Sequence, residues 1–248
     1  MREGWHHIRN ILILIAGIVA VWELAYLAVG DVALRSPWQT IAFLGGLMKT
    51  DLFWTHLAES MRAFAVALVL AVVLGLLIGF ALGLHKLSGD AMEPMLVALY
   101  SIPKITLYPI ILLAFGLGIW AKIAFGAIHG IIPVALFTLS AVRSTRPILI
   151  KTGRVMKLSS PEMARTILFP AAVPEIFTGI RVGFSLTLVG TVLGEMFASQ
   201  HGLGYLLMNA ISLYNVDVIM AVTFLLCVFA AAVNTVLLVI DKRLHHGA

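Results

Sequence analysis

Long apolar stretches, separated by short polar segments, dominate this sequence of 248 residues. A helix needs about 20 apolar residues to cross a bilayer, whereas the strands of a transmembrane barrel alternate apolar and polar positions. The continuous runs therefore predict an all-α integral membrane protein, in which 1–248 forms a single transmembrane domain. We place six transmembrane helices at about 11–29, 57–84, 92–116, 119–139, 175–198 and 218–240.

The charges follow the same pattern. Of all residues, 61% are hydrophobic and only 12% are charged, about half the share in a soluble domain. With both termini cytoplasmic, the inner segments carry eleven Lys and Arg residues and the outer segments three. This is the positive-inside bias of a multi-pass membrane protein. The net charge of +5 is thus explained by topology, with lipid as the surroundings, and we expect no nucleic-acid partner.

Glycines recur four residues apart within the predicted spans, for example at Gly75, Gly79 and Gly83. Small residues at this spacing let two helix backbones approach closely inside a membrane. We interpret them as packing positions.

The third predicted span is interrupted by the sequence SIPKITLYP. Proline removes a backbone hydrogen bond and kinks a helix, and a lysine at membrane depth needs water or a partner. One interpretation is that Tyr100, Pro103, Lys104 and Tyr108 line a translocation path. The other is a packed kink from which Lys104 reaches the cytoplasmic headgroups, and the sequence favours neither.

A few polar residues in or beside the spans need partners. Glu195 either lines the outer mouth of the path or bonds backbone N–H groups of the turn that follows, and we favour the second. We expect Glu59 to pair with Arg62, and Arg181 to neutralise an acid or cap carbonyl groups near the inner face. Glu23 lies in the first span without an evident partner.

The inner loop 140–175 is the longest polar segment and has its own helix signals. Residues 147–157 can form a short helix, and Ser160, Pro161 and Glu162 suit the first residues of a second one. We expect that second helix to end before Pro170. Two short helices at a tight corner form a rigid protrusion that could dock on a soluble partner. The alternative is a surface loop lying on anionic lipid.

This loop resembles the cytoplasmic loop of binding-protein-dependent ABC importer permeases, whose pattern runs E-A-A, three residues, Gly, nine residues and I-x-L-P. Most of the chain is similar to the nitrate, sulfonate and taurine group of that family, in the right order. The motifs are HLAESMRAFAVALVLAVVLGLLIGFALG (56–83), EPMLVALYSIPKITLYPIILLAFGLGIWAK (93–122), ILFP (167–170), FPAAVPEIFTGIRVGF (169–184) and GEMFASQHGLGYLL (194–207).

The resemblance implies a type I ABC importer fold and a permease that moves a small solute by alternating access. It also implies two ATP-binding subunits, a second permease copy and a substrate-binding protein as partners. Nitrate, a sulfonate or a vitamin precursor are the implied solutes. ATP and magnesium would be bound by the partner subunit, and this chain would hold no cofactor.

The family's corner glycine falls on Lys157, so we expect the segment KLSSP to make the corner here, with Ser160 as the cap. Carried over by position, the residues that couple to the ATPase are Lys157, Leu158, Ser159, Ser160, Pro161 and Glu162.

Other chemistries find little support. The sequence has no G-x-x-x-x-G-K-[ST] phosphate loop, so the chain is not itself the motor, and we expect a transporter rather than an enzyme. Ser185 and His129 lie in different spans without the motif of a membrane protease. The single cysteine, Cys227, gives no disulfide framework and no thiolate metal cluster. A stand-alone secondary transporter is the alternative, although only one span is clearly broken.

Overall fold

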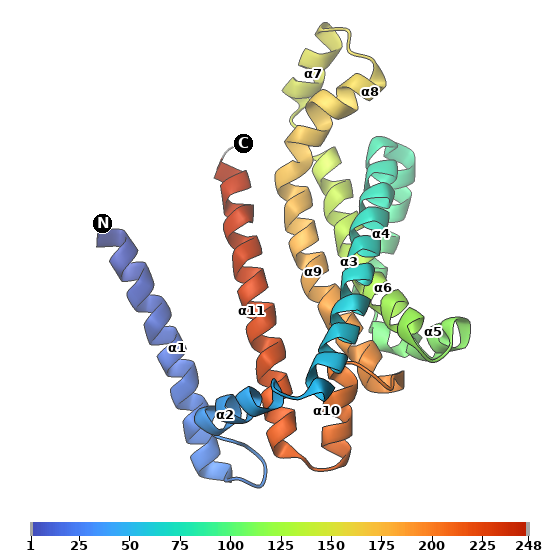
Figure 1. Cartoon of the computed structure of the whole chain (residues 1–248). Helices are drawn as coiled ribbons and strands as arrows, with labels where there is room; N and C mark the ends of the chain where they lie inside the picture. Colours follow the sequence, from blue (N-terminus) through green and yellow to red (C-terminus); the bar gives the residue numbers. More distant parts are fainter. Residues whose placement is uncertain (1, 247–248) are drawn as a thin grey trace.

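The computed structural model describes the backbone of residues 2–246, and the side chains of these residues apart from 2–8, 147, 160, 161, 164, 198 and 246. All regular secondary structure in this part of the chain is helical. Figure 1 shows the helices α1 (Arg2–Val29), α2 (Pro37–Leu47), α3 (Asp51–Leu84), α4 (Lys86–Ser101), α5 (Tyr108–Phe115), α6 (Ile119–Arg143), α7 (Pro147–Val155), α8 (Ser160–Met163), α9 (Phe169–Ala198), α10 (Leu203–Ser212) and α11 (Val216–His246).

Six membrane crossings fit this arrangement, as the sequence predicts. Within the described residues, five helices are long and apolar enough to cross a membrane, namely α1, α3, α6, α9 and α11. The bent pair of α4 and the segment 104–115, which meet at 91°, gives a sixth crossing when it is counted as one broken span. The bend follows Ser101, so the predicted break in the third span is confirmed.

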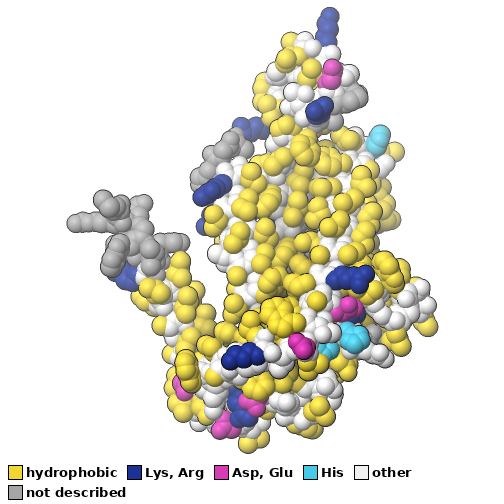
Figure 2. All heavy atoms as spheres, in the orientation of Figure 1, with side chains coloured by type: hydrophobic (Ala, Val, Ile, Leu, Met, Phe, Trp, Pro, Cys, Tyr) yellow, Lys and Arg dark blue, Asp and Glu magenta, His cyan; other side chains and the backbone are white. Residues whose placement is uncertain are grey.

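The two faces of the membrane are distinguished by charge. Both ends of the chain point to the same side as α7 and α8, whereas α2 and α10 lie at the opposite side (Figure 1). Most of the Lys and Arg residues belong to the first side, which we call the inner end, in agreement with the positive-inside bias. Figure 2 shows hydrophobic side chains covering the middle of the visible face, between charged side chains at the two ends.

The core consists of α3, α6 and α9, which pack closely along their lengths. A Cβ atom at Gly75 of α3 would lie 2.6 Å from Cβ of Val134, and one at Gly183 of α9 would lie 2.6 Å from Cγ2 of the same valine. Val134 of α6, which is fully buried, therefore sits between two glycines of its neighbours. The predicted role of the spaced glycines in helix packing is confirmed at this position.

The second short helix, α8, ends at Met163, before Pro170, but the fifth span follows it without a break and begins at Phe169, earlier than the predicted 175. A π-helical turn, Ala164–Leu168, follows α8 and leads directly into α9, whose first turn contains Pro170. Proline is compatible with a first turn because the N–H groups there have no partner within the helix. The protrusion and the fifth span are thus joined without a break in helical backbone, and α8 meets α9 at an angle (Figure 1).

Candidate functional site

The first candidate site is the inner protrusion formed by residues 147–168, which we call the knuckle. Its turn closes α7 with two backbone hydrogen bonds, from Lys157 N–H to the Arg154 carbonyl (3.0 Å) and from Leu158 N–H to the Gly153 carbonyl (3.1 Å). These bonds form a Schellman motif, whose penultimate residue must be left-handed. Lys157 holds that position with φ +52°. The lysine itself therefore makes the corner that a glycine makes in the family.

Ser159, rather than the predicted Ser160, caps the second helix. The Glu162 carboxylate accepts hydrogen bonds from the Ser159 N–H (2.8 Å) and the Ser159 hydroxyl (2.6 Å). This is the S-x-x-E spacing of a capping box. The two Ser159 hydrogen bonds hold the pKa of Glu162 below its ordinary value. The side chains of Ser160 and Pro161 lie outside the described residues.

The two arms of the knuckle pack closely because one arm carries a glycine. A Cβ atom at Gly153 would lie 2.5 Å from Sδ of Met163 and 2.7 Å from Cδ1 of Ile167. The outer surface of the same arm is apolar, since Val155 is 83% and Met156 65% exposed. Lys151, Arg154 and Lys157, which are all exposed, lie in or directly after the same helix and give this part of the knuckle a positive charge. The two arms of the knuckle are therefore tightly packed against each other, and the outer surface presents apolar and basic side chains to a partner.

The second candidate site is the bend between α4 and α5. Lys104 is only 9% exposed and donates a hydrogen bond from Nζ to the Tyr100 carbonyl (3.1 Å), where it meets the negative end of α4. The Tyr100 ring lies 5.4 Å from the same ammonium group. Pro103 is exposed at the bend, as is Tyr100. The structure thus brings Tyr100, Pro103 and Lys104 together at the bend.

Tyr108 lies apart from the bend, in a packed environment. It is 4% exposed, stacks edge-to-face on Phe125 and donates its hydroxyl to the Gly194 carbonyl (2.5 Å). It thereby ties α5 to the outer part of α9, one residue before Glu195.

A third site, which we call the outer cluster, contains His56, Glu59, Ser60, Lys122, Glu195 and the loop 199–202. Glu195 is fully buried; it accepts the Ser60 hydroxyl (2.8 Å) and the Gly204 N–H (2.9 Å). The geometry thus places Glu195 at the first turn of α10, as an acceptor for backbone N–H.

Lys122 fastens the loop before α10 and corrects one predicted pairing. Its side chain is 1% exposed, and Nζ contacts the Glu59 carboxylate (3.1 Å) and the His201 carbonyl (2.9 Å). Glu59 therefore pairs with Lys122 of α6, across two helices, rather than with Arg62 of its own helix. A pattern within one helix could not have shown this partner, because the two residues are 63 positions apart.

Two further polar residues have different outcomes. Arg181 lies 3.5 Å from the Asp241 carboxylate near the inner end, so the predicted neutralisation of an acid is confirmed. Glu23 is half-buried on α1, and no hydrogen bond or ion pair involves it among the side chains that the structure describes.

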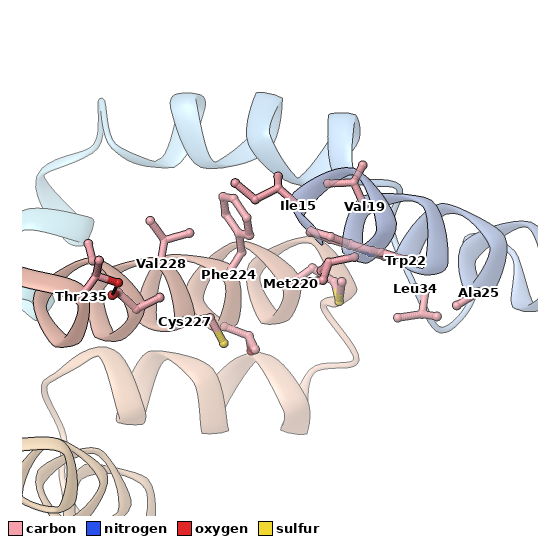
Figure 3. A pocket seen from close by; sticks show the side chains of 14 residues that line it. Ile15, Val19, Trp22, Ala25, Leu34, Met220, Phe224, Cys227, Val228 and Thr235 are labelled. Atoms are coloured by element: carbon pink, nitrogen blue, oxygen red, sulfur yellow. Dashed lines mark hydrogen bonds between the residues drawn. The ribbon is translucent and has the colours of Figure 1, made fainter. Parts of the chain in front are cut away.

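An apolar groove of about 900 Å³ separates α1 from α11 (Figure 3). Trp22 of α1 and Phe224 of α11 both line it and contact one another, with their ring centroids 5.7 Å apart, and Cys227 lies on its wall. A polar solute needs polar partners along its path, which the wall of this groove scarcely provides. The groove is therefore a surface for apolar neighbours and not the path of a charged solute.

Comparison with known proteins accords with this geometry. The sequence profile of the family described as "Binding-protein-dependent transport system inner membrane component" matches residues 71–247. The taurine transport permease TauC of Escherichia coli is 29% identical over 205 residues, which are 83% of this chain and 74% of that protein. The nitrate import permease NrtB of Synechocystis sp. is 30% identical over 214 residues, 83% of this chain and 76% of that protein.

Two further comparisons extend this picture. The formylaminopyrimidine transport permease ThiX of Halalkalibacterium halodurans is 29% identical over 189 residues, 76% of this chain and 75% of that protein. Among solved structures, the methionine ABC transporter MetNI in an inward-facing conformation matches with a TM-score of 0.66 and 19% identity. That match covers 75% of this chain and 93% of the other, and it shows that the fold is shared.

Proposed function

Because this chain belongs to the family of binding-protein-dependent transport system inner membrane components, we propose that two copies of it form the pathway of an ATP-driven importer. Each copy engages one ATP-binding subunit through its knuckle, and a substrate-binding protein delivers the solute at the outer end. ATP and Mg²⁺ are bound by the ATP-binding subunits, and this chain holds no cofactor. The chain is a multi-pass permease of the inner membrane rather than an enzyme, and the family membership sets aside a stand-alone secondary transporter.

The knuckle is the observation that carries this proposal. A loop that only connects two spans needs neither a Schellman turn nor a capped second helix. Exposed apolar side chains with basic residues beside them are complementary to a partner groove that has an apolar floor and an acidic rim. The residues Lys157, Leu158, Ser159 and Glu162, together with Ser160 and Pro161, form the tip that enters this groove.

Motion at the knuckle is transmitted by α9. The π-helical turn connects the knuckle to this helix of 30 residues without a gap, so a displacement of the knuckle is passed on to α9. When ATP draws the two ATP-binding subunits together, the α9 helices of the two copies tilt and the pathway changes from inward-open to outward-open. This is alternating access, driven by contacts that differ between two states.

Cross-linking tests the docked knuckle. Val155 is 83% and Leu87 85% exposed, and both lie at the inner end, so Leu87 is a matched control. In a Cys227→Ala background, Val155→Cys is expected to cross-link to the co-expressed ATP-binding subunit, with a yield that changes when ATP is added. Leu87→Cys is expected to cross-link far less. Equal yields from both positions, or transport without any contact at the knuckle, would contradict the proposal.

For the solute we propose a small anion, with a vitamin precursor as the second candidate. The relatives named for taurine and nitrate support the first, and the one named for formylaminopyrimidine supports the second. Lys104 supplies a buried cation at the bend, and Tyr100 and Pro103 lie beside it on the path. Tyr108 and Glu195, which are buried and bonded to neighbouring helices, support the outer part of this path by fixing α5 and α10 in place.

Transport assays test the solute class. In vesicles containing the complete transporter, Lys104→Met is expected to lower nitrate or sulfonate uptake strongly, and Lys104→Arg to keep part of it. Lys49→Met, which removes an exposed cation at the outer end, is the control and is expected to have little effect. Unchanged anion uptake in Lys104→Met would refute the role of Lys104, without affecting the test of the knuckle.

A further inference from the structure

The start of α10 is held by side chains from other helices. Gly202 N–H donates to Nδ1 of His56 (3.0 Å), Leu203 N–H to the Ser60 hydroxyl (2.7 Å) and Gly204 N–H to Glu195 (2.9 Å). The first N–H groups of any helix lack partners within the helix, and the N-cap of α10 is a glycine without a side chain to offer. The cap of α10 is thus supplied entirely by α3 and α9.

His56 is one of two titratable members of this cap; the other, the Glu195 carboxyl, keeps an acceptor oxygen for the Gly204 N–H even when it is protonated. A ring nitrogen accepts a hydrogen bond only when it carries no proton, so the contact with Gly202 requires a neutral imidazole with its proton on Nε2. Addition of a second proton would place two N–H groups against each other. The Ser60 hydroxyl does not gain or lose a proton under these conditions, whereas imidazole groups do.

The surroundings of His56 contain charges of both signs. Burial disfavours a positive imidazole most, and the His201 ring, whose centroid lies 6.0 Å away, and Lys122 of α6 oppose it as well, as does the positive end of α10. Glu59 of α3 and Glu195 of α9 are the acids of the cluster. Each acid already has a cation or N–H partner, Lys122 for Glu59 and Gly204 for Glu195. The Tyr205 ring of α10 covers another side, with its centroid at 5.7 Å.

Protons can reach this position from the outer solution. His56 is itself buried, but the neighbouring His201 is exposed at the outer end. Histidine side chains also lie next to acidic and basic ones on the outer part of the surface in Figure 2. The imidazole therefore lies beside an exposed side chain on the side that meets the external medium.

We propose that His56 is a proton-sensitive latch that positions α10. The neutral ring holds the Gly202 N–H and keeps the first turn of α10 docked on α3. In an acidic outer medium the ring takes up a proton, the Gly202 N–H is released and α10 loosens. Because α10 joins the outer end of α9 to α11, loosening α10 weakens the link between the two helices, and the transporter slows.

Amide exchange in the complete transporter, reconstituted in lipid nanodiscs, tests this latch. Loss of one hydrogen bond is expected to speed exchange at residues 202–206 about tenfold as the pH falls from about 7.5 to well below 6.5, the ordinary imidazole value, after correction for the intrinsic rate. In His56→Asn the side-chain oxygen takes the place of Nδ1 and accepts at every pH. Exchange in this variant is therefore expected to be slow and independent of pH.

A matched histidine variant and a spectroscopic measurement complete the test. His201→Asn is expected to keep the pH-dependent acceleration, because the acceptor on His56 is intact. Acceleration that persists in His56→Asn, or its absence in the unmodified transporter, would overturn the proposal. Should His56→Asn fail to fold, nitrogen NMR of the unmodified protein decides: His56 must show an unprotonated Nδ1 at about pH 7.5, and a protonated Nδ1 there would refute the latch.

Discussion

At the tip of the knuckle Lys157 has φ +52°, a conformation that costs most residues energy because Cβ approaches the following carbonyl oxygen. The same geometry recurs at Tyr214, φ +53°, where α10 ends. There Tyr214 N–H donates to the Ile211 carbonyl (3.1 Å) and Asn215 N–H to the Ala210 carbonyl (2.9 Å). Two Schellman turns of this chain are therefore made by large side chains, one at each side of the membrane.

Replacement of Lys157 by glycine is expected to stabilise the knuckle locally by about 1 kcal/mol, because glycine adopts this backbone freely. Amide exchange at Lys157 and Leu158, whose N–H groups close the turn, measures the effect directly. Lys157→Gln is the matched control, since it removes the charge and keeps the strained backbone. Slower exchange in both variants would attribute the effect to charge instead, and faster exchange in Lys157→Gly would contradict the strain argument.

The cap at Glu162 is expected to depend on pH. Its two hydrogen bonds from Ser159 favour the ionised form and lower its pKa from the ordinary value of 4.5. The stabilising contribution is therefore complete above pH 4.5 and is lost as the pH falls through the lowered pKa. Protection of the Ser159 N–H should decline over that range, whereas in Glu162→Gln it should be weaker and nearly constant. Constant protection in the unmodified chain would refute this assignment.

At the scale of elements, the close approach of α3 and α6 depends on positions that have no side chain. A Cβ atom at Gly79 would lie 2.7 Å from the Ala135 carbonyl oxygen, which is backbone and cannot move aside cheaply. Gly79→Ala is therefore expected to destabilise the bundle by about 1–3 kcal/mol, the usual range for overpacking. Thermal unfolding in detergent measures this loss. Gly17→Ala is the control, because a Cβ atom there meets nothing within 4 Å, and an equal loss in both variants would argue against the contact.

The sequence was sufficient for elements whose signals are local. Apolar length located the spans, glycine spacing indicated close packing, and Pro103 located the bend. Local signals do not predict an ion pair whose second residue lies far along the chain. Glu59 has Arg62 three positions away, yet the ion pair forms with Lys122, which only the packing of α3 against α6 brings near. The sequence does not predict that the knuckle continues into α9, because a proline such as Pro170 can either end a helix or occupy its first turn.

At the scale of the whole molecule, α9 connects two sites at opposite sides of the membrane. The knuckle precedes its first residue, and Glu195 lies three residues before its last. At the outer end, Glu195 bonds both Ser60 of α3 and Gly204 of α10, and the hydroxyl of Tyr108 bonds the neighbouring Gly194. A displacement of the knuckle that tilts α9 therefore moves α3, α5 and α10 together, provided that these bonds hold.

Loss of the Glu195 side chain is expected to uncouple ATP hydrolysis from transport. In Glu195→Ala, two donors in a buried site lose their acceptor, so α10 no longer follows α9, and the number of ATP molecules hydrolysed per solute transported should rise several-fold. Glu195→Gln keeps an oxygen for the Ser60 hydroxyl and the Gly204 N–H, and should stay near the unmodified ratio. Vesicles that contain the ATP-binding subunits and the substrate-binding protein allow both quantities to be measured together. A parallel fall of ATP hydrolysis and transport in Glu195→Ala would mean that the residue only supports folding. A rise in the ratio of ATP hydrolysed to solute transported would instead show that the bonds of Glu195 at the start of α10 couple the motion of the knuckle to transport.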